Sequence, residues 1–136
     1  MEQNDELVDA LMRSAFAVMA VLNTVGAELD LSLTQLRVLG ILRDRPPVRM
    51  ATLAEHLGLD RSTMTGLVDR AEKRGLLVRR PSPTDGRAVE VSIAPGSVEL
   101  VESTYRRVVE AVTPLVADLK EADRRRLRTL LEQVGS

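Results

Sequence analysis

Short hydroxyl side chains lie between two arginines in residues 61–70. Helical spacing would place Met64, Leu67 and Val68 on one buried face of this segment. The outward face would then carry Arg61, Ser62, Thr63, Thr65 and Arg70. Hydroxyl groups hydrogen-bond to base edges, and guanidinium groups bind guanine and phosphate. The pattern therefore predicts a helix that contacts double-stranded DNA in its major groove.

The residues before this segment predict a helix-turn-helix. Leu53 and Leu57 fall on one face of a first helix, and Gly58 permits the left-handed backbone that ends it. Asp60 can then cap the second helix by accepting a backbone N–H bond. An amphipathic run, a glycine-centred break and a capped second run are typical of this motif.

Two short strands and a polar loop are expected next. Residues 76–80 and 88–93 have the composition of strands, and the loop between them is rich in turn-forming residues. Residues 48–50 are expected to add an edge strand. A helix-turn-helix followed by a basic hairpin is a winged helix. The candidate DNA contacts outside the second helix are Arg49, Arg79, Arg80, Asp85 and Arg87.

These motifs resemble the MarR family of bacterial transcriptional regulators. The resemblance is carried by the helix that includes Leu53-Ala54 and Leu57, the Arg74-Gly75-Leu76-Leu77 junction, the wing pattern Asp85-x-Arg87-x-x-x-Val91, and an upstream helix at 33–39. It implies a mainly α (α+β) fold, a winged helix-turn-helix with a small antiparallel β-wing and long N- and C-terminal dimerisation helices. We expect a single domain, 1–136, with a DNA-binding lobe at 33–94 and dimerisation helices at 5–30 and 96–135.

The resemblance also implies a function and partners. Such a chain would be a homodimer that binds two inverted half-sites of double-stranded DNA in the bacterial cytoplasm, more often as a repressor than as an activator. Small phenolic or aromatic carboxylic acids would release it by binding between the dimerisation helices and the DNA-binding lobe. Arg13, the one charge in residues 10–27, is a candidate partner for such an anion. The alternative is that Arg13 extends to solvent.

Charge is distributed unevenly along the chain. Residues 1–30 carry one arginine against six carboxylates, a net −5, whereas residues 61–90 carry seven cations against four carboxylates, a net +3. Positive charge therefore coincides with the segment expected to meet phosphate. At the wing tip, the Asp85 carboxylate is expected to hold the Arg87 guanidinium outward, where a narrow minor groove attracts it.

The chain ends are more apolar than a small lobe can cover. Residues 10–27 and the leucines of 127–131 predict helices that pack against a second copy. An acidic leader argues against a signal peptide, and Arg13, Asn23 and Thr24 argue against a membrane span.

Other expected structural details are Thr34 as the cap of the 33–43 helix, frayed residues 1–7, and a kink at Pro114. The arginines at 124–126 and 128 are interpreted as a solvated helix face.

Other classes of function lack the residues they need. The chain has no cysteine and one histidine, His56, so neither a metal site nor a nucleophilic enzyme site is expected, and no cofactor is implied. Single-stranded nucleic-acid binding would need aromatic platforms, and the chain has one Phe and one Tyr. The remaining alternative is a winged helix that contacts protein without binding DNA specifically.

Overall fold

The computed structural model describes residues 2–135, so Met1 and Ser136, the ends of the expected domain, lie outside the described residues. The helices are α1 (Glu2–Leu29), α2 (Leu33–Leu42), α3 (Met50–Leu57), α4 (Arg61–Lys73), α5 (Val98–Val112) and α6 (Glu121–Leu131). The strands are β1 (Val48–Arg49), β2 (Leu77–Pro81) and β3 (Val89–Ile93). Two short 3-10 helices, η1 (Pro95–Ser97) and η2 (Thr113–Val116), flank α5.

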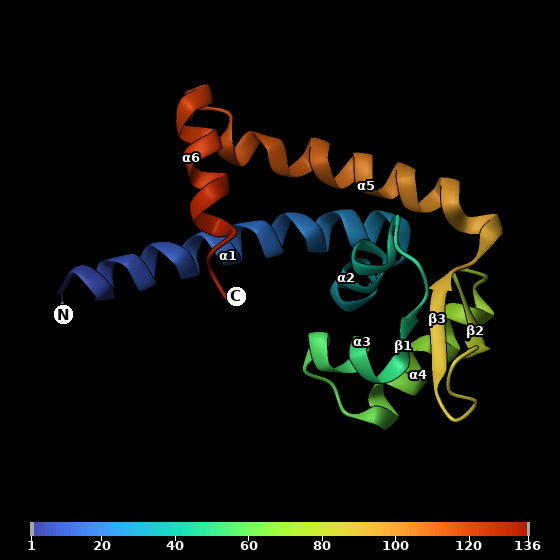
Figure 1. Cartoon of the computed structure of the whole chain (residues 1–136). Helices are drawn as coiled ribbons and strands as arrows, with labels where there is room; N and C mark the ends of the chain where they lie inside the picture. The colour runs from blue at the N-terminus through green and yellow to red at the C-terminus, as the bar shows by residue number, and fades with distance from the viewer. Residues whose placement is uncertain (1, 136) are drawn as a thin grey trace.

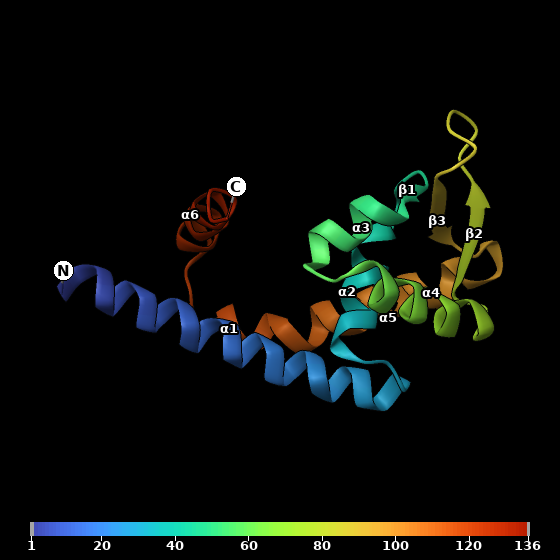
Figure 2. The ribbon, with the colours of Figure 1, turned by 90° about the horizontal axis from the view of Figure 1, so that it is seen from below.

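Two long helices carry a compact lobe at one end. Helices α1 and α5 run side by side. The lobe of α2, α3, α4 and the sheet lies below the C-terminal end of α1 and the N-terminal end of α5 (Figure 1). An ion pair between Arg107 of α5 and Glu28 of α1, with 3.0 Å between Nη2 and Oε1, joins the two helices. Helix α6 stands at the far end of α5, away from the lobe (Figure 2). The expected mainly helical fold with a small β-wing is confirmed.

The start of α2 differs from expectation in its capping residue. Ser32 is the N-cap, because its Oγ accepts the backbone N–H of Gln35 at 3.1 Å and the Gln35 side chain accepts the Ser32 N–H at 2.9 Å. This reciprocal capping box places Thr34 inside the first turn, so the prediction of Thr34 as cap was wrong.

The start of α1 also differs. The helix begins at Glu2, so the expectation of fraying was wrong for residues 2–7, while Met1 lies outside the described residues. Glu2 and Asp5 lie in its first turn, where carboxylates interact favourably with the helix dipole.

The predicted helix-turn-helix is confirmed. Helix α3 ends at Gly58, whose φ of +65° is the left-handed conformation that glycine adopts without strain. Asp60 follows as the N-cap of α4, with its side chain bonded to the Thr63 N–H. The turn therefore has the geometry expected from the residue types at Gly58 and Asp60.

The wing is a three-stranded antiparallel sheet in the order β1-β3-β2. Val91 of β3 pairs with Val48 of β1 on one side and with Arg79 of β2 on the other. The predicted edge strand is thus confirmed at Val48–Arg49, whereas Met50 begins α3. The sheet attaches the hairpin to the helix-turn-helix through this short edge strand.

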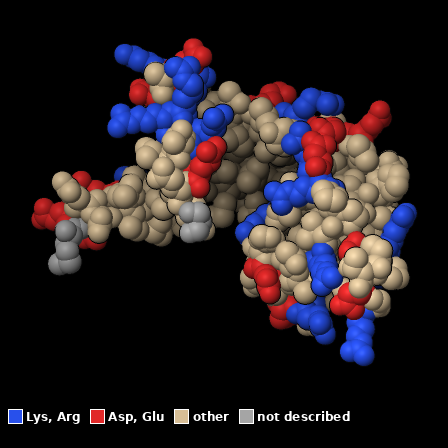
Figure 3. All heavy atoms as spheres, viewed as in Figure 1, with Lys and Arg blue, Asp and Glu red and all other residues tan. Residues whose placement is uncertain are grey.

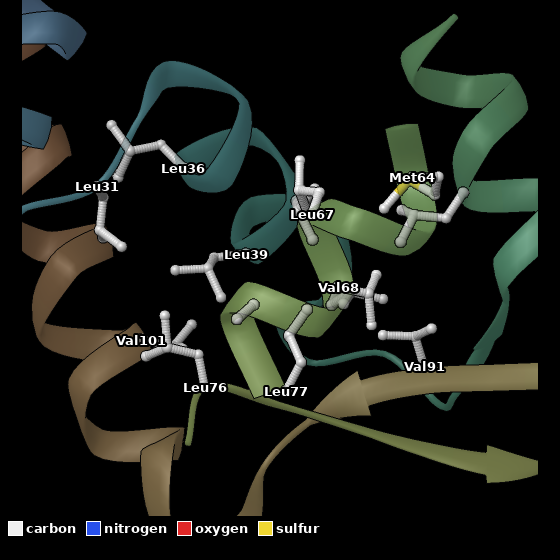
Figure 4. Close-up of a cluster of buried hydrophobic side chains, with 14 of the residues drawn as sticks. Leu31, Leu36, Leu39, Met64, Leu67, Val68, Leu76, Leu77, Val91 and Val101 are labelled. Atoms are coloured by element: carbon white, nitrogen blue, oxygen red, sulfur yellow. The ribbon is translucent and has the colours of Figure 1, made fainter. Parts of the chain in front are cut away.

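The core lies in the lobe and is completed by α5. Met64 and Val68 of α4 lie near Val91 of β3 and Leu77 of β2 (Figure 4). Leu53 of α3 belongs to the same cluster, and all five side chains are at most 1% exposed. The long helices contribute less. Large apolar side chains that remain exposed on α1 and α6 are Leu7, Val8, Leu11, Met12, Phe16, Leu130 and Leu131.

The C-terminal segment follows the predicted break. Helix α5 ends at Val112, and Pro114 lies in η2, because proline cannot continue the α-helical hydrogen bonds. In α6, Arg125 pairs with Glu121 and Arg128 with Glu132, each four residues apart. These exposed pairs agree with the interpretation of this arginine cluster as a solvated face.

Two helical glycines have opposite surroundings. A Cβ added at Gly26 of α1 would overlap the carbonyl oxygen of Leu31, so the tight turn into α2 requires glycine there. A Cβ added at Gly40 of α2 would meet no atom within 4 Å. Gly40 is therefore not required by backbone packing in the single chain.

We expect the two Gly→Ala substitutions to change stability in opposite directions. Gly26→Ala should lower the free energy of unfolding by about 1–3 kcal/mol, as overpacking does. Gly40→Ala should raise it by about 0.5–1 kcal/mol, because alanine loses less backbone entropy in a helix. Urea unfolding at one protein concentration measures both, and a Gly40→Ala protein as unstable as Gly26→Ala would contradict the assigned surroundings.

Candidate functional site

The outward face of α4 is built on its capped N-terminus. The Asp60 Oδ1 accepts the Thr63 backbone N–H at 2.7 Å and the Ser62 hydroxyl at 3.0 Å. The Thr63 N–H bond, followed by the Thr63 and Ser62 hydroxyls, lowers the pKa of Asp60. Arg61, Ser62 and Thr63 are exposed around this cap. The first turn of α4 is thus held rigid while its side chains face solvent.

A groove lies between α3, the first turns of α4, and the wing. Its volume is about 710 Å³, and it brings together residues from four separate stretches of the chain. Six of the ten predicted DNA contacts line it, namely Arg49, Arg61, Thr65, Arg79, Asp85 and Arg87. The other four, Ser62, Thr63, Arg70 and Arg80, are exposed outside the groove lining. The groove lining therefore carries four arginines and one carboxylate.

Arg79 has a second role that its sequence position did not reveal. Its Nη2 lies 2.6 Å from Asp69 Oδ1 and 3.1 Å from Glu72 Oε1, and its backbone N–H donates to Glu72 Oε2 at 3.3 Å. The hydrogen bond that the Arg79 guanidinium donates to Glu72 is the main cause of a raised Arg79 pKa. Arg79 therefore ties β2 to α4, and two carboxylates offset its charge. The only sequence signal was the spacing of Asp69 and Glu72 on one face of α4.

The wing tip corrects the predicted pairing of Asp85 with Arg87. The Asp85 Oδ1 accepts the backbone N–H of Arg87 at 3.1 Å, and the ion pairs within residues 2–135 do not include one between these two side chains. A carboxylate two residues before an N–H favours this Asx-turn over a side-chain pair. Asp85 shapes the turn, and the Arg87 guanidinium extends freely from it.

The wing loop is further ordered by Ser82. Its side chain is buried, and its Oγ accepts the N–H groups of Thr84 and Asp85, both at 3.3 Å. The Ser82 N–H donates to the Ala88 carbonyl at 2.9 Å across the loop. The loop therefore projects from β2 and β3 as an internally bonded tip (Figure 2).

A second hollow lies between the long helices and the lobe. This cavity, of about 450 Å³, is lined by α1, α2 and α5. Its walls are Met19, Leu22, Leu33, Leu36, Arg37, Leu39, Gly40, Arg43, Val101, Thr104, Tyr105 and Val108. Arg13, the predicted anion partner, is exposed on α1 and is not among these residues. The two cations at the cavity are instead Arg37 and Arg43, which sequence reasoning missed.

Arg43 is already paired within the chain. Its Nε and Nη2 donate to the Glu102 carboxylate at 2.9 and 3.3 Å, and its guanidinium lies 3.6 Å over the Tyr105 ring. The bond to Glu102 raises the pKa of Arg43. Arg37 instead donates from Nη2 to the backbone carbonyl of His56 at 2.9 Å. The cavity thus has one cation with a carboxylate partner and one bonded to a neutral acceptor.

Acidic side chains gather at the projecting start of α1, whereas the lobe and α6 carry both basic and acidic side chains (Figure 3). The acidic start of α1 projects away from the lobe, and the hollow between α6 and the lobe is lined mainly by uncharged atoms (Figure 3).

Within residues 2–135, no three His, Cys, Asp or Glu side chains form a cluster that would hold a metal ion. A capped outward helix beside a hydrogen-bonded basic hairpin defines the chain as a winged helix-turn-helix protein.

Comparisons with known proteins place the chain in a family. The MarR family model matches residues 29–88. The homoprotocatechuate degradative operon repressor of Escherichia coli is 25% identical over 130 residues, which are 96% of this chain and 88% of that protein. A crystal structure of a mutant MarR from Escherichia coli has a TM-score of 0.80 and 25% identity, covering 94% of this chain and 95% of MarR. NadR in complex with 4-hydroxyphenylacetate has a TM-score of 0.79 and 23% identity, covering 92% of this chain and 89% of NadR.

The chain belongs to the MarR family, whose members are transcription regulators and not enzymes. It spans 50% and 58% of the length of two other bacterial relatives that it matches.

Within residues 2–135, α1 alone is long and apolar enough to cross a membrane. Helices of soluble proteins meet the same criterion, and MarR family regulators are soluble DNA-binding proteins.

The cap of α4 gives a pH-dependent prediction. Because Asp60 has a lower pKa in the folded chain, its ionised form stabilises the fold above its unfolded pKa of about 3.9, and this contribution is lost as pH falls through the folded value. We expect Asp60→Ala to be less stable than the wild type at pH 7, with a smaller difference at pH 2.

Asp60→Asn is the matched control, because asparagine caps a helix without titrating. Thermal unfolding of the three proteins at both pH values measures the effect. An unchanged difference between wild type and Asp60→Ala at the two pH values would show that ionisation of Asp60 does not support the cap.

Proposed function

We propose that this chain is a homodimeric, sequence-specific DNA-binding repressor of the bacterial cytoplasm that a small phenolic or aromatic acid releases from its operator. The observation that carries the DNA-binding part is the groove, where the start of α4 and the wing present Arg49, Arg61 and Arg87 on one concave surface. Such a surface matches a duplex whose major groove receives α4 and whose flanking minor groove receives the wing.

The proposed contacts have different roles. Thr65 and Arg61 lie where α4 would meet base edges, so they are the candidates for sequence readout. Arg49, Arg70 and Arg80 would meet phosphates, which add affinity without sequence preference. Ser62 and Thr63 also face outward, and because the Ser62 hydroxyl donates to Asp60, it would act on bases mainly as an acceptor. Arg79 would act chiefly by holding β2 against α4.

Duplex titrations at several salt concentrations test the DNA-binding proposal. The wild-type affinity should fall by about 10³-fold or more between 50 and 200 mM salt if each subunit meets several phosphates. Arg87→Ala should cost about 1–3 kcal/mol of operator binding and make the salt dependence shallower by about one ion per subunit, because the free guanidinium at the wing tip is removed.

Arg124→Ala is the control, because Arg124 is also an exposed arginine and lies on α6, outside the groove lining. It should change neither quantity. An Arg87→Ala protein that binds like the wild type would show that the wing does not touch DNA. A salt-independent interaction of the wild type would favour the alternative of a winged helix that contacts protein.

The proposed dimer is supported by the apolar surface of α1 and α6. Leu11, Met12 and Phe16 of α1 are between 44% and 57% exposed, and Leu130 and Leu131 of α6 are about half exposed. A second copy covering both helices would bury these side chains, and obligate interfaces of this kind bury more than about 2,000 Å². Two-fold symmetry would then space the two α4 helices by one DNA turn, roughly 34 Å.

We expect the intact chain to sediment as a dimer at micromolar concentration. Phe16→Asp should shift it toward the 15.0 kDa monomer, because it places a carboxylate in the proposed interface. Lys73→Asp, at an exposed position of α4 in the lobe, is a control for added negative charge outside the proposed interface. Sedimentation velocity measures both, and a wild-type chain that remains a 15.0 kDa species at this concentration would contradict the dimer.

The proposed effector is supported by the cavity between α1, α2 and α5. Its volume of about 450 Å³ lies in the range of small-molecule sites, and its walls are largely aliphatic. NadR, a fold relative, was solved with 4-hydroxyphenylacetate, an aromatic acid. A ligand in this cavity would lie between the long helices and the lobe, where it can change the orientation of one relative to the other.

A further inference from the structure

The corner between α4 and β2 is bonded to the ends of both long helices. Arg74 directly follows α4, and its Nη1 donates to the backbone carbonyl of Asp30, the residue after α1. The carbonyl oxygen of Gly75 accepts the hydroxyl of Ser97, the residue before α5. These bonds join residues that are 44 and 22 positions apart in the chain. Two side chains outside the proposed DNA contacts therefore connect the end of α4 with α1 and α5.

Ser97 does not make the local hydrogen bond that its position favours. It is the N-cap residue of α5, where a serine side chain usually accepts a backbone N–H, but its side chain makes no cap bond. The side chain is buried, and its hydroxyl donates to Gly75. Ser82 and Thr104, the other buried polar side chains in residues 2–135, bond to groups at most four residues away. The Ser97 hydroxyl thus serves a contact between elements and not its own helix.

Arg74 supplies a cation to the C-terminal end of α1. The last turn of α1 contains no basic residue, and the chain leaves the helix through Asp30, whose φ is +55°. Carbonyl groups at a helix C-terminus lack partners within the helix and carry partial negative charge. The guanidinium of Arg74 satisfies the Asp30 carbonyl from the lobe. The end of α1 is therefore stabilised by a residue that belongs to the end of α4.

The position of α4 relative to the long helices determines which DNA a dimer can fit. Helix α4 packs mainly on α3 and β2, so it moves with the lobe. One base pair added between two half-sites moves them apart by about 3.4 Å and rotates them by about 35°. A dimer follows this change only if each lobe turns relative to α1 and α5. Such a turn would strain the bonds of Arg74 to Asp30 and of Ser97 to Gly75.

We propose that Ser97 and Arg74 are positioning residues that fix the spacing of the two half-sites accepted by the dimer, because they hold the end of α4 to α5 and α1. The inference rests on the proposed function, since it requires a dimer that binds two half-sites. A backbone bond from the Ala94 N–H to the Leu76 carbonyl, at 2.9 Å, keeps the corner folded when either side chain is removed. Each lobe then still binds one half-site, while the two lobes lose their fixed separation.

The variants each remove one side-chain bond, and each has a matched control. Ser97→Ala removes the hydroxyl, and Ser103→Ala is its control, because the Ser103 hydroxyl bonds to Leu100 within α5. Arg74→Gln removes the guanidinium, whereas Arg74→Lys keeps a cation. Lys73→Gln is the control for charge, because Lys73 is the exposed cation next to Arg74. Circular dichroism and sedimentation velocity verify that each variant is folded and dimeric.

Binding to duplexes of altered spacing is the first measurement. The wild type selects its half-sites from random-sequence duplexes, and synthetic duplexes then carry the selected pair with one base pair added or removed. This change should weaken binding by the wild type about ten-fold or more, because the dimer contains each bond twice and one hydrogen bond changes an equilibrium by about two- to ten-fold.

Ser97→Ala and Arg74→Gln should reduce this loss of affinity to about three-fold or less, by the same estimate. Arg74→Lys should keep part of the loss, and both controls should keep all of it. All variants should bind a duplex with one half-site about as tightly as the wild type.

Spin labels give a second measurement that does not require DNA. The chain has no cysteine, so Thr63→Cys places a single label on the exposed first turn of α4 in each subunit. Pulsed electron–electron double resonance then measures the distance between the two α4 helices of the dimer. The distance distribution should be narrow in the chain with Thr63→Cys alone and in both controls. It should be broader when Ser97→Ala or Arg74→Gln is added.

The two measurements separate this proposal from the proposed function. Unchanged distance distributions and an unchanged spacing preference in Ser97→Ala and Arg74→Gln would overturn the proposal and leave DNA binding in place. An equal loss of affinity at every spacing would also overturn it, because the two residues would then support folding alone. A wild type that selects no duplex, with broader distributions in both variants, would refute DNA binding and support the placement of α4 by this corner. A wild-type chain that remains monomeric would overturn the proposal together with the dimer.

Discussion

The rest of the structure depends on the burial of one face of α4. Met64 and Val68 are fully buried in a core shared with α2, α3, β2 and β3, so this face of α4 must point inward. Because the inner face of α4 is apolar and fully buried, the polar residues of the helix must face outward. Residues at helical spacing from Met64 are therefore committed to the core, and those between them to the outward face, of which Arg61 and Thr65 line the groove. The same enclosure brings the hairpin alongside α4, since Val91 and Leu77 belong to the core and to the sheet at once.

Ion pairs between elements decide which arginines remain available. Arg79 connects β2 with α4, Arg43 connects the end of α2 with α5, and Arg107 connects α5 with α1. Partly exposed pairs of this kind add modest stability, but they fix side-chain directions and offset charge. The groove arginines without such a partner, such as Arg87, are those to which we assign DNA contacts. The distribution of carboxylates is thus as informative about function as the distribution of cations.

The packed pair of α1 and α5 has the lobe at one end and exposed apolar side chains toward the other. The lobe contains its own core, whereas the projecting half of α1 and helix α6 have large side chains that the single chain leaves in water. Helix α2 belongs to both parts, because it contributes Val38 and Leu42 to the core and Gly40 and Arg37 to the cavity. A conformational change at the cavity would therefore act on a helix that also packs in the core of the DNA-binding lobe.

Local features of this fold were determined by the sequence alone. The left-handed Gly58, the Asp60 cap, the buried face of α4 and the break at Pro114 depend on residues at most four positions apart, whose geometry a helix or turn specifies. The motif spacing also identified the family. The error at Thr34 arose because Ser32 and Gln35 form a reciprocal cap that a single polar residue does not reveal.

Only the tertiary structure decided which charged side chains meet. Arg79 pairs with two carboxylates of another element, Asp85 bonds to backbone and not to the Arg87 side chain, and the cavity contains Arg37 and Arg43 but not Arg13. Long arginine side chains reach partners several ångströms from their own helix or strand, so their contacts depend on how elements pack together. That packing comes from burial of the core, which the order of residues along one element does not specify.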